Sequence, residues 1–133
     1  QKIIGIDIDG EIRAYPVNIL SSREVVNDTL TGFYTAVAYW PLEDLAVVYS
    51  RSIGDRVLTF APSGWTYHST FVLYDYETES MWYPYVDYQK AGETPLVCIA
   101  GDLADTTIKE IPSTMTSFKE WYETNPDSKY MDF

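Results

Sequence analysis

The stretch that indicates the fold most clearly is Ile4–Tyr15, IGIDIDGEIRAY. Apolar residues fall on every second position, which is the period of a β-strand, and Asp9-Gly10 is a favoured hairpin turn. A two-residue turn would place the isoleucines opposite Glu11, Arg13 and Tyr15, whereas an odd number of loop residues puts the even-numbered apolar residues on one face. We therefore predict a hairpin with an odd loop, such as three residues with a bulge.

Further runs of strand type follow along the chain. Phe33–Trp40 and Leu45–Tyr49 are nearly continuous apolar runs, as is typical of central strands covered on both faces. Before them come Val17–Leu20 and then Arg23–Asp28, which is expected to form one helical turn or a short irregular segment. Pro62-Ser63-Gly64 is expected to separate two of the later strands. These later strands are predicted at Arg56–Ala61, Thr70–Tyr76 and Met81–Tyr83.

One convincing helix is predicted near the end of the sequence. Ser117 followed by Glu120 has the spacing of a capping box, and Asn125-Pro126 ends the helical pattern. Phe118, Trp121 and Tyr122 form an apolar stripe that is expected to face the core. The predicted fold is therefore mainly β (α+β): one compact β-rich domain over residues 1–133, with seven or more mostly antiparallel strands and a C-terminal helix.

The charge of the chain limits its partners. Nine basic and twenty acidic residues give a formal net charge of −11 at pH 7, with no basic cluster. Such a chain repels the phosphates of nucleic acid and anionic lipid, so nucleic acid is not expected as a partner. No run approaches the roughly 18 apolar residues of a membrane helix, so membrane insertion is not expected. The acidity either keeps an exposed protein soluble or attracts cations and a basic partner.

The inventory of reactive side chains is short. Cys98 is the single cysteine, which allows no intrachain disulfide, and its aliphatic neighbours predict a buried core residue. His68 is the single histidine and is expected in a partly exposed loop. One cysteine and one histidine cannot supply the usual ligands of zinc or iron. Asp7–Glu11 looks superficially like the start of a calcium loop, but the later oxygen ligands are missing.

Short motifs are distributed along the whole chain in a fixed order: Gly10–Pro16, Ile19-Leu20, Glu24–Asp28, Leu58–Phe60, Ser63-Gly64, Tyr74-Asp75, Thr78–Trp82, Phe118–Trp121 and Asn125-Pro126. Their order and spacing resemble the prokaryotic domain of unknown function numbered 3179. The resemblance covers essentially the whole chain and is looser from Tyr83 to Gly101.

The resemblance also implies a site that this chain has lost. In that family the loop corresponding to Trp40–Ala46 commonly reads Cys-Pro-Leu-Cys-Gly-Thr-Ala, and a histidine commonly precedes the Glu-Val-Val-Asn-Asp run. Two such cysteines with a nearby histidine can bind a soft metal or cycle between dithiol and disulfide, because the spacing lets two sulfurs converge on one centre. Here Trp40 and Glu43 replace the cysteines and Arg23 replaces the histidine, and these residues can do neither. The retained residues Pro41, Leu42, Asn27 and Asp28 are then expected to serve the fold.

Two classes of function follow from this interpretation. The first is a non-catalytic extracytoplasmic module that acts through a protein partner or self-association, as a subunit of a surface or filamentous assembly. In this class Trp40 fills the vacated space, Arg23 forms an ion pair with Glu43, and no enzyme activity or cofactor is expected. The twelve Tyr and four Trp favour export, and some tyrosines either offer contact area or cover the domain's own core. These tyrosines are Tyr83, Tyr85 and Tyr88.

The second class is a domain that binds a small ligand or a hard cation, with or without catalysis. It needs a polar cleft around the Trp40 loop, and calcium is the candidate cofactor. A bound hard metal or a cleft would favour this class, whereas a continuous contact between subunits would favour the first. The candidate ligand-binding residues are Arg23, Trp40, Glu43, Asp44 and His68.

Overall fold

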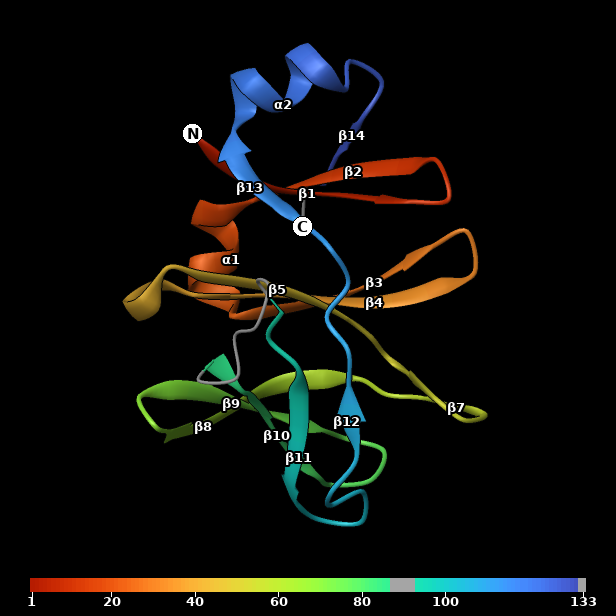
Figure 1. The fold of residues 1–133 in the computed structure, drawn as a ribbon, viewed down its shortest axis with the longest axis vertical. Helices are drawn as coiled ribbons and strands as arrows, with labels where there is room; N and C mark the ends of the chain where they lie inside the picture. Colours follow the sequence, from red (N-terminus) through yellow and green to blue (C-terminus); the bar gives the residue numbers. More distant parts are fainter. Residues whose placement is uncertain (87–92, 132–133) are drawn as a thin grey trace.

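The computed structural model describes residues 1–86 and 93–131. Within these ranges the chain forms fourteen strands and two α-helices, which lie in layers along the long axis of the molecule (Figure 1). Neighbouring strands run antiparallel, except that β14 (Lys129–Tyr130) runs parallel to β2 (Glu11–Pro16). The predicted β-rich fold with mostly antiparallel strands and a C-terminal helix is confirmed. No helix of the described residues is long and apolar enough to span a membrane.

The upper sheet of Figure 1 has the strand order β13-β1-β2-β14, with β1 at Lys2–Ile8 and β13 at Thr114–Ser117. Helix α2 (Phe118–Thr124) covers its outer face. Ser117 caps α2 as predicted, because its side chain accepts a hydrogen bond from the backbone N–H of Glu120 at 3.1 Å. This cap fixes where β13 ends and α2 begins.

The predicted odd loop between β1 and β2 is wrong. Ile8 pairs with Glu11, so only Asp9 and Gly10 form the turn. Both have positive φ, 52° and 85°, as the favoured two-residue turn of a hairpin requires. The parity argument failed because it assumed one buried face, whereas this sheet is buried on both. Tyr15 therefore lies in the core, on the face of Ile4 and Ile6, while Ile3 and Ala14 contact Trp121 on the other face.

The middle sheet has the order β3-β4-β5 and follows helix α1 (Val17–Arg23). The two predicted central strands are confirmed as β4 (Phe33–Trp40) and β5 (Leu45–Ser50). The sequence did not predict β3 (Val25–Leu30), because Asn27-Asp28 interrupts its apolar pattern with two polar side chains. Both side chains have hydrogen-bond partners inside the fold, as described below.

The lower sheet has the order β12-β11-β10-β9-β8, and a small hairpin, β6-β7, precedes it. Pro62–Gly64 does not separate two strands as predicted, because a register shift between Pro62 and Thr66 lets β8 continue through it. The chain reverses instead at His68 and Ser69, which have φ of 49° and 64°. The strands are β6 (Ser52–Ile53), β7 (Arg56–Val57), β8 (Phe60–Tyr67), β9 (Thr70–Asp75), β10 (Met81–Pro84), β11 (Leu96–Ala100) and β12 (Thr107–Ile108).

Three apolar clusters hold the layers together, one at each boundary. The largest lies between the middle and lower sheets and contains Cys98, which confirms the prediction of a core cysteine. Burial raises the pKa of its thiol. Under α2, the ring of Trp121 lies on Gly5, where an added Cβ would be 2.3 Å from the ring. The predicted apolar stripe of α2 is only partly buried. Trp121 lies in the core, whereas Phe118 is 41% exposed.

Candidate functional site

The Trp40 loop, defined as Trp40–Asp44, joins β4 to β5 through a single 3₁₀ turn, η1 (Pro41–Glu43). Pro41 stands at the first position of the turn, where its fixed φ suits the helical conformation and its missing N–H is not needed. Asp44 ends the turn in the left-handed conformation, with φ of 48°. The loop is thus a defined turn with a fixed direction for each side chain.

Trp40 attaches this loop to the hairpin between β8 and β9. Its ring stacks on Phe71 with 5.4 Å between centroids and 4° between planes. Its indole N–H donates a hydrogen bond to the carbonyl of Ser69 at 3.2 Å. Phe71 belongs to the core between the middle and lower sheets, so Trp40 extends that core to the surface.

The two acids of the loop also act as anchors. The carboxylate of Glu43 accepts a hydrogen bond from the hydroxyl of Thr70 at 2.8 Å, and no ion pair among the described residues joins it to Arg23. Asp44 accepts a hydrogen bond from the hydroxyl of Tyr39 and lies 3.3 Å from the ammonium group of Lys2. The bond from Tyr39 lowers the pKa of Asp44, and the same bond raises the pKa of Tyr39 to about 12.

The other two candidate residues lie on either side of the loop. Arg23 ends α1, and the carbonyl of the next residue, Glu24, accepts a hydrogen bond from the N–H of Tyr39 at 2.9 Å. The backbone of Arg23 therefore lies close to the end of β4, where that strand runs into the Trp40 loop. His68 is exposed in the β8–β9 turn, with its ring 4.3 Å from that of Tyr67. The fold thus gathers Trp40, Glu43 and the His68 turn, while Asp44 bonds to Tyr39 and Lys2.

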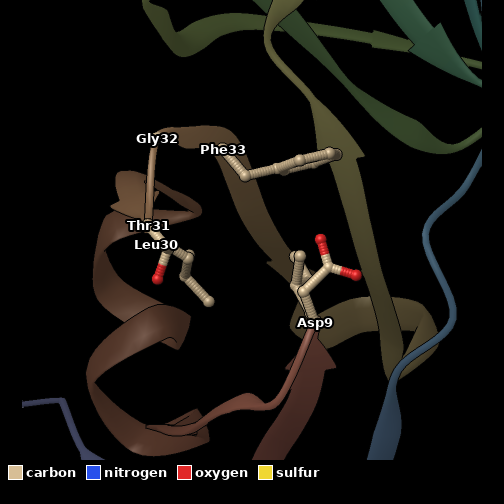
Figure 2. A pocket seen from close by; sticks show the side chains of 6 residues that line it. Asp9, Leu30, Thr31, Gly32 and Phe33 are labelled. Atoms are coloured by element: carbon tan, nitrogen blue, oxygen red, sulfur yellow. The ribbon is translucent and has the colours of Figure 1, made fainter.

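The described residues contain no group of three or more His, Cys, Asp and Glu side chains able to hold a metal ion. In the segment that looks like a calcium loop, the carboxylate of Asp7 accepts the N–H of Gly10 at 3.1 Å and so closes the hairpin turn. A pocket of about 100 Å³ lies between this turn and the one joining β3 to β4. Figure 2 shows Asp9 as the carboxylate beside it. One carboxylate does not supply the six to eight oxygens of a calcium site. The other residues that line this pocket are Ile8, Leu30, Thr31, Gly32 and Phe33.

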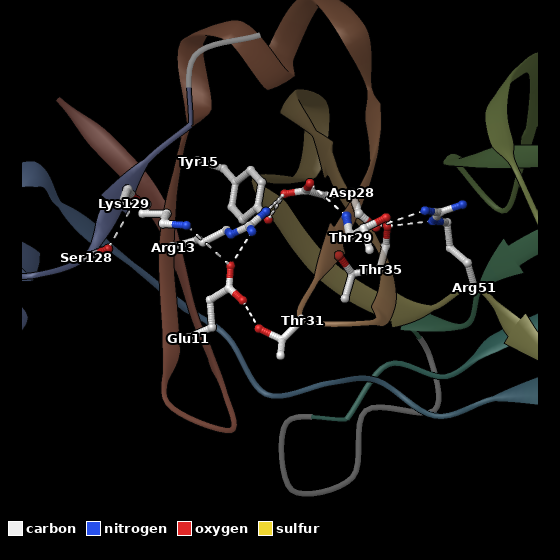
Figure 3. Close-up of polar contacts among 10 residues, drawn as sticks. All are labelled: Glu11, Arg13, Tyr15, Asp28, Thr29, Thr31, Thr35, Arg51, Ser128 and Lys129. Atoms are coloured by element: carbon white, nitrogen blue, oxygen red, sulfur yellow. Dashed lines mark hydrogen bonds and ion pairs between the residues drawn. The ribbon is translucent and has the colours of Figure 1, made fainter.

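A polar network that the sequence did not predict joins the upper and middle sheets (Figure 3). Arg13 donates hydrogen bonds to Asp28, at 2.8 Å, and to Glu11. The hydroxyl of Tyr15 donates to the same carboxylate oxygen of Asp28 at 2.6 Å. The side chain of Arg13 is only 11% exposed, so its charge depends on these two carboxylates.

The charges of this network shift the pKa values of its members. Burial alone would raise the pKa of Asp28, but the hydrogen bonds from Tyr15 and Arg13 outweigh it and hold the pKa below its usual value. Hydrogen bonds from Thr31 and Arg13 lower the pKa of Glu11. Burial, with the bond to Asp28, raises the pKa of Tyr15. Both acids are therefore ionised in the folded protein at neutral pH.

The network continues toward the lower sheet. Arg51 is buried and donates to the backbone carbonyl of Asp28 at 2.9 Å, as well as to two other carbonyls. The side-chain amide of Asn27 forms hydrogen bonds of 2.9 Å with both the N–H and the carbonyl of Phe60, so it ties β3 to β8. Asn27 and Asp28 thus serve the fold as expected, whereas Leu42 does not, since its side chain is 81% exposed.

The motif Thr78–Trp82 is also structural. Asp75 is fully buried and accepts hydrogen bonds from the indole of Trp82 at 2.7 Å and from the backbone N–H of Thr78 at 2.6 Å. The hydroxyl of Thr78 bonds to the same carboxylate and contacts Ser80 at 2.7 Å. These bonds close the turn between β9 and β10 and orient the largest side chain of the core.

The comparisons with known proteins give a family for the whole chain. The family model described as "Protein of unknown function (DUF3179)" matches residues 1–132. No curated protein and no solved structure matches the chain. The match spans the upper, middle and lower sheets together with the Trp40 loop. The chain therefore belongs to the DUF3179 family of proteins of unknown function.

Proposed function

We propose that this domain is a non-catalytic module that acts outside the cytoplasm through a protein partner or through association with its own copies. In this proposal it is a subunit of a surface or filamentous assembly, and the Trp40 loop belongs to its contact surface. The loop is where the family resemblance implies a thiol site, so its present chemistry decides between an interaction role and a catalytic one.

The observation that carries the proposal is that the side chains of the Trp40 loop serve as anchors. Trp40 donates a hydrogen bond to Ser69, and Glu43 accepts one from Thr70. Asp44 accepts hydrogen bonds from Tyr39 and Lys2. A nucleophile or a general base must be within hydrogen-bond reach of a substrate, and these groups are occupied by the protein itself. The anchored loop leaves one apolar side chain, that of Leu42, directed to solvent. A rigid turn that presents an apolar side chain suits binding better than chemistry.

Exposed aromatic side chains of β8, whose hairpin with β9 contacts the loop, support the same proposal. Trp65 and Tyr67 of β8 are 69% and 46% exposed, and Tyr67 packs edge-on against Tyr83 at 4.9 Å. Aromatic side chains supply contact area at low entropic cost. Of the three tyrosines expected either to offer contact area or to cover the core, Tyr85 is exposed and Tyr83 is buried, while Tyr88 lies outside the described residues. The net charge of −11 adds repulsion between copies that salt or a divalent cation screens.

The test is the light-scattering mass of the purified domain over a range of concentrations, once with calcium and once with a chelator. The proposal predicts a mass that rises with protein concentration, and more steeply at higher ionic strength. A monomer in every condition, together with saturable heat of calcium binding that Glu43→Gln removes, would contradict the proposal. That result would favour the alternative of a cation-binding cleft.

A further inference from the structure

Leu42 has the highest exposed fraction, 81%, among the large apolar side chains of the described residues. It stands at the centre of η1, between Pro41 and Glu43. The residues on both sides of it are fixed, since Trp40 stacks on Phe71 and Glu43 bonds to Thr70. The Leu42 knob, meaning Pro41 and Leu42 together, is therefore held in one place before any partner arrives. Such preorganisation lowers the entropic cost of binding.

An apolar pocket of about 440 Å³ lies on the lower sheet. Val97 of β11 and Thr107 of β12 line it. Both alternate with core residues, namely Leu96, Cys98 and Ile108, so the pocket lies on the face turned away from the core. Its lining is mostly apolar, and Lys109 and Glu93 are its two charged residues. The volume is within the range of about 300–1,000 Å³ that pockets for small ligands and anchor side chains occupy. The remaining lining residues are Tyr85 and Pro95.

One charge beside the knob and one charge at the pocket are opposite in sign. Glu43 follows Leu42 directly, and Lys109 is exposed at the pocket and forms no ion pair with any described residue. A leucine seated in the pocket would bring the adjacent Glu43 to the pocket's rim, where the ammonium group of Lys109 would attract it. Glu93 at the same pocket repels it, so the register that places Glu43 beside Lys109 and away from Glu93 is favoured.

We propose that the Leu42 knob of one copy of this chain docks into the pocket at Val97, Thr107 and Lys109 of a second copy. This inference rests on the proposed function and names the two surfaces through which the copies meet. The knob and the pocket are different surfaces of the molecule, so the contact is heterologous. Repeated from copy to copy, such a contact produces a ring or an open chain of subunits.

Two single variants and their mixture test this contact. Leu42→Asp removes the knob and keeps the pocket, whereas Thr107→Glu blocks the pocket and keeps the knob. Each variant alone is expected to associate at least tenfold more weakly than the wild type in sedimentation equilibrium. In an equimolar mixture, the intact knob of Thr107→Glu enters the intact pocket of Leu42→Asp. The mixture is therefore expected to form complexes of two chains that do not grow further.

The matched control is Val57→Asp, which adds the same charge at a 37% exposed apolar residue of β7 and is expected to associate like the wild type. All three substituted side chains are exposed, and circular dichroism checks that each variant is folded. Association of Leu42→Asp equal to that of the wild type would overturn the inference and leave the proposed function intact. Loss in both variants without recovery in the mixture would also overturn it. A wild type that stays monomeric at every concentration would refute self-association through any surface.

Discussion

Replacing Asp28 by Asn tests the network that joins the upper and middle sheets (Figure 3). The carboxylate accepts hydrogen bonds from Tyr15 at 2.6 Å, from Arg13 at 2.8 Å and from the backbone N–H of Thr29 at 2.8 Å. The amide keeps the shape but removes the charge, and it places a donor where two donors already point. Glu11 remains as a partner of the Arg13 charge.

The expected cost follows from these contacts. A hydrogen bond to a charged group contributes about 1.5–3 kcal/mol, and breaking a buried ion pair costs about 3–5 kcal/mol. Because Glu11 still pairs with Arg13, we expect Asp28→Asn to lower the free energy of unfolding by about 2–4 kcal/mol. The assay is urea unfolding at pH 7, followed by tryptophan fluorescence. Asp55→Asn makes the same charge change at an exposed turn and is expected to stay within about 0.5 kcal/mol of the wild type.

The same network predicts the dependence of stability on pH. The pKa values of Asp28 and Glu11 are held below their usual values of 3.8 and 4.5, so the folded state binds fewer protons than the unfolded state in this range. The stabilisation is present above about pH 4.5 and is lost as the pH falls through the usual values toward the lowered ones. Asp28→Asn is expected to lose less stability on acidification than the wild type. An unchanged free energy of unfolding at pH 7, or the same acid dependence in both proteins, would refute this reasoning.

Three further substitutions test the layers and the loop. Asn27→Ala leaves the backbone N–H and carbonyl of Phe60 unpaired, so it is expected to lower the free energy of unfolding in urea by about 2–4 kcal/mol. An effect below about 0.5 kcal/mol would show that this contact between β3 and β8 is dispensable. Gly5→Ala places a Cβ 2.3 Å from the ring of Trp121, so it is expected to displace α2 and to lower the free energy of unfolding by about 1–3 kcal/mol. The near-ultraviolet circular dichroism is expected to change, and an unchanged spectrum would contradict the packing of Trp121 on Gly5. Trp40→Ala removes the stack on Phe71 and is expected to lower the free energy of unfolding by about 2–4 kcal/mol, as measured by thermal unfolding. Calcium binding measured by calorimetry is expected to stay unchanged. A loss of calcium binding without a loss of stability would contradict the role of Trp40 as an anchor.

The parts of the fold that the sequence predicts are those with a strong local pattern. The apolar runs of β4 and β5 and the capping box of α2 are local features, and the structure has them where the pattern places them. The turn at Asp9-Gly10 was misjudged because its register depends on what covers the second face of the sheet, and this cover, Trp121, comes more than a hundred residues later. Tertiary burial on both faces therefore overrode the alternation of the hairpin.

The candidate site shows the same difference between local sequence features and long-range packing. The residue types of the Trp40 loop could be compared with the family motif, but their partners Ser69, Thr70 and Phe71 come from a hairpin whose turn the sequence misplaced. The Arg13–Asp28 pair was missed for a different reason. Arg13 and Asp28 belong to different strands, β2 and β3, and only the packing of two sheets brings the two together. A charge within a buried strand was the one signal that pointed to a partner elsewhere.

The most direct test of the account is a concentration series of amide spectra in nuclear magnetic resonance, from dilute to concentrated wild-type protein. The account predicts that shifts and line broadening begin at two surfaces, one around Pro41–Asp44 and one around Val97, Thr107 and Lys109, while the Arg13–Asp28 network stays unchanged. Spectra that are identical at all concentrations, or changes spread evenly over the molecule, would contradict association through the Trp40 loop.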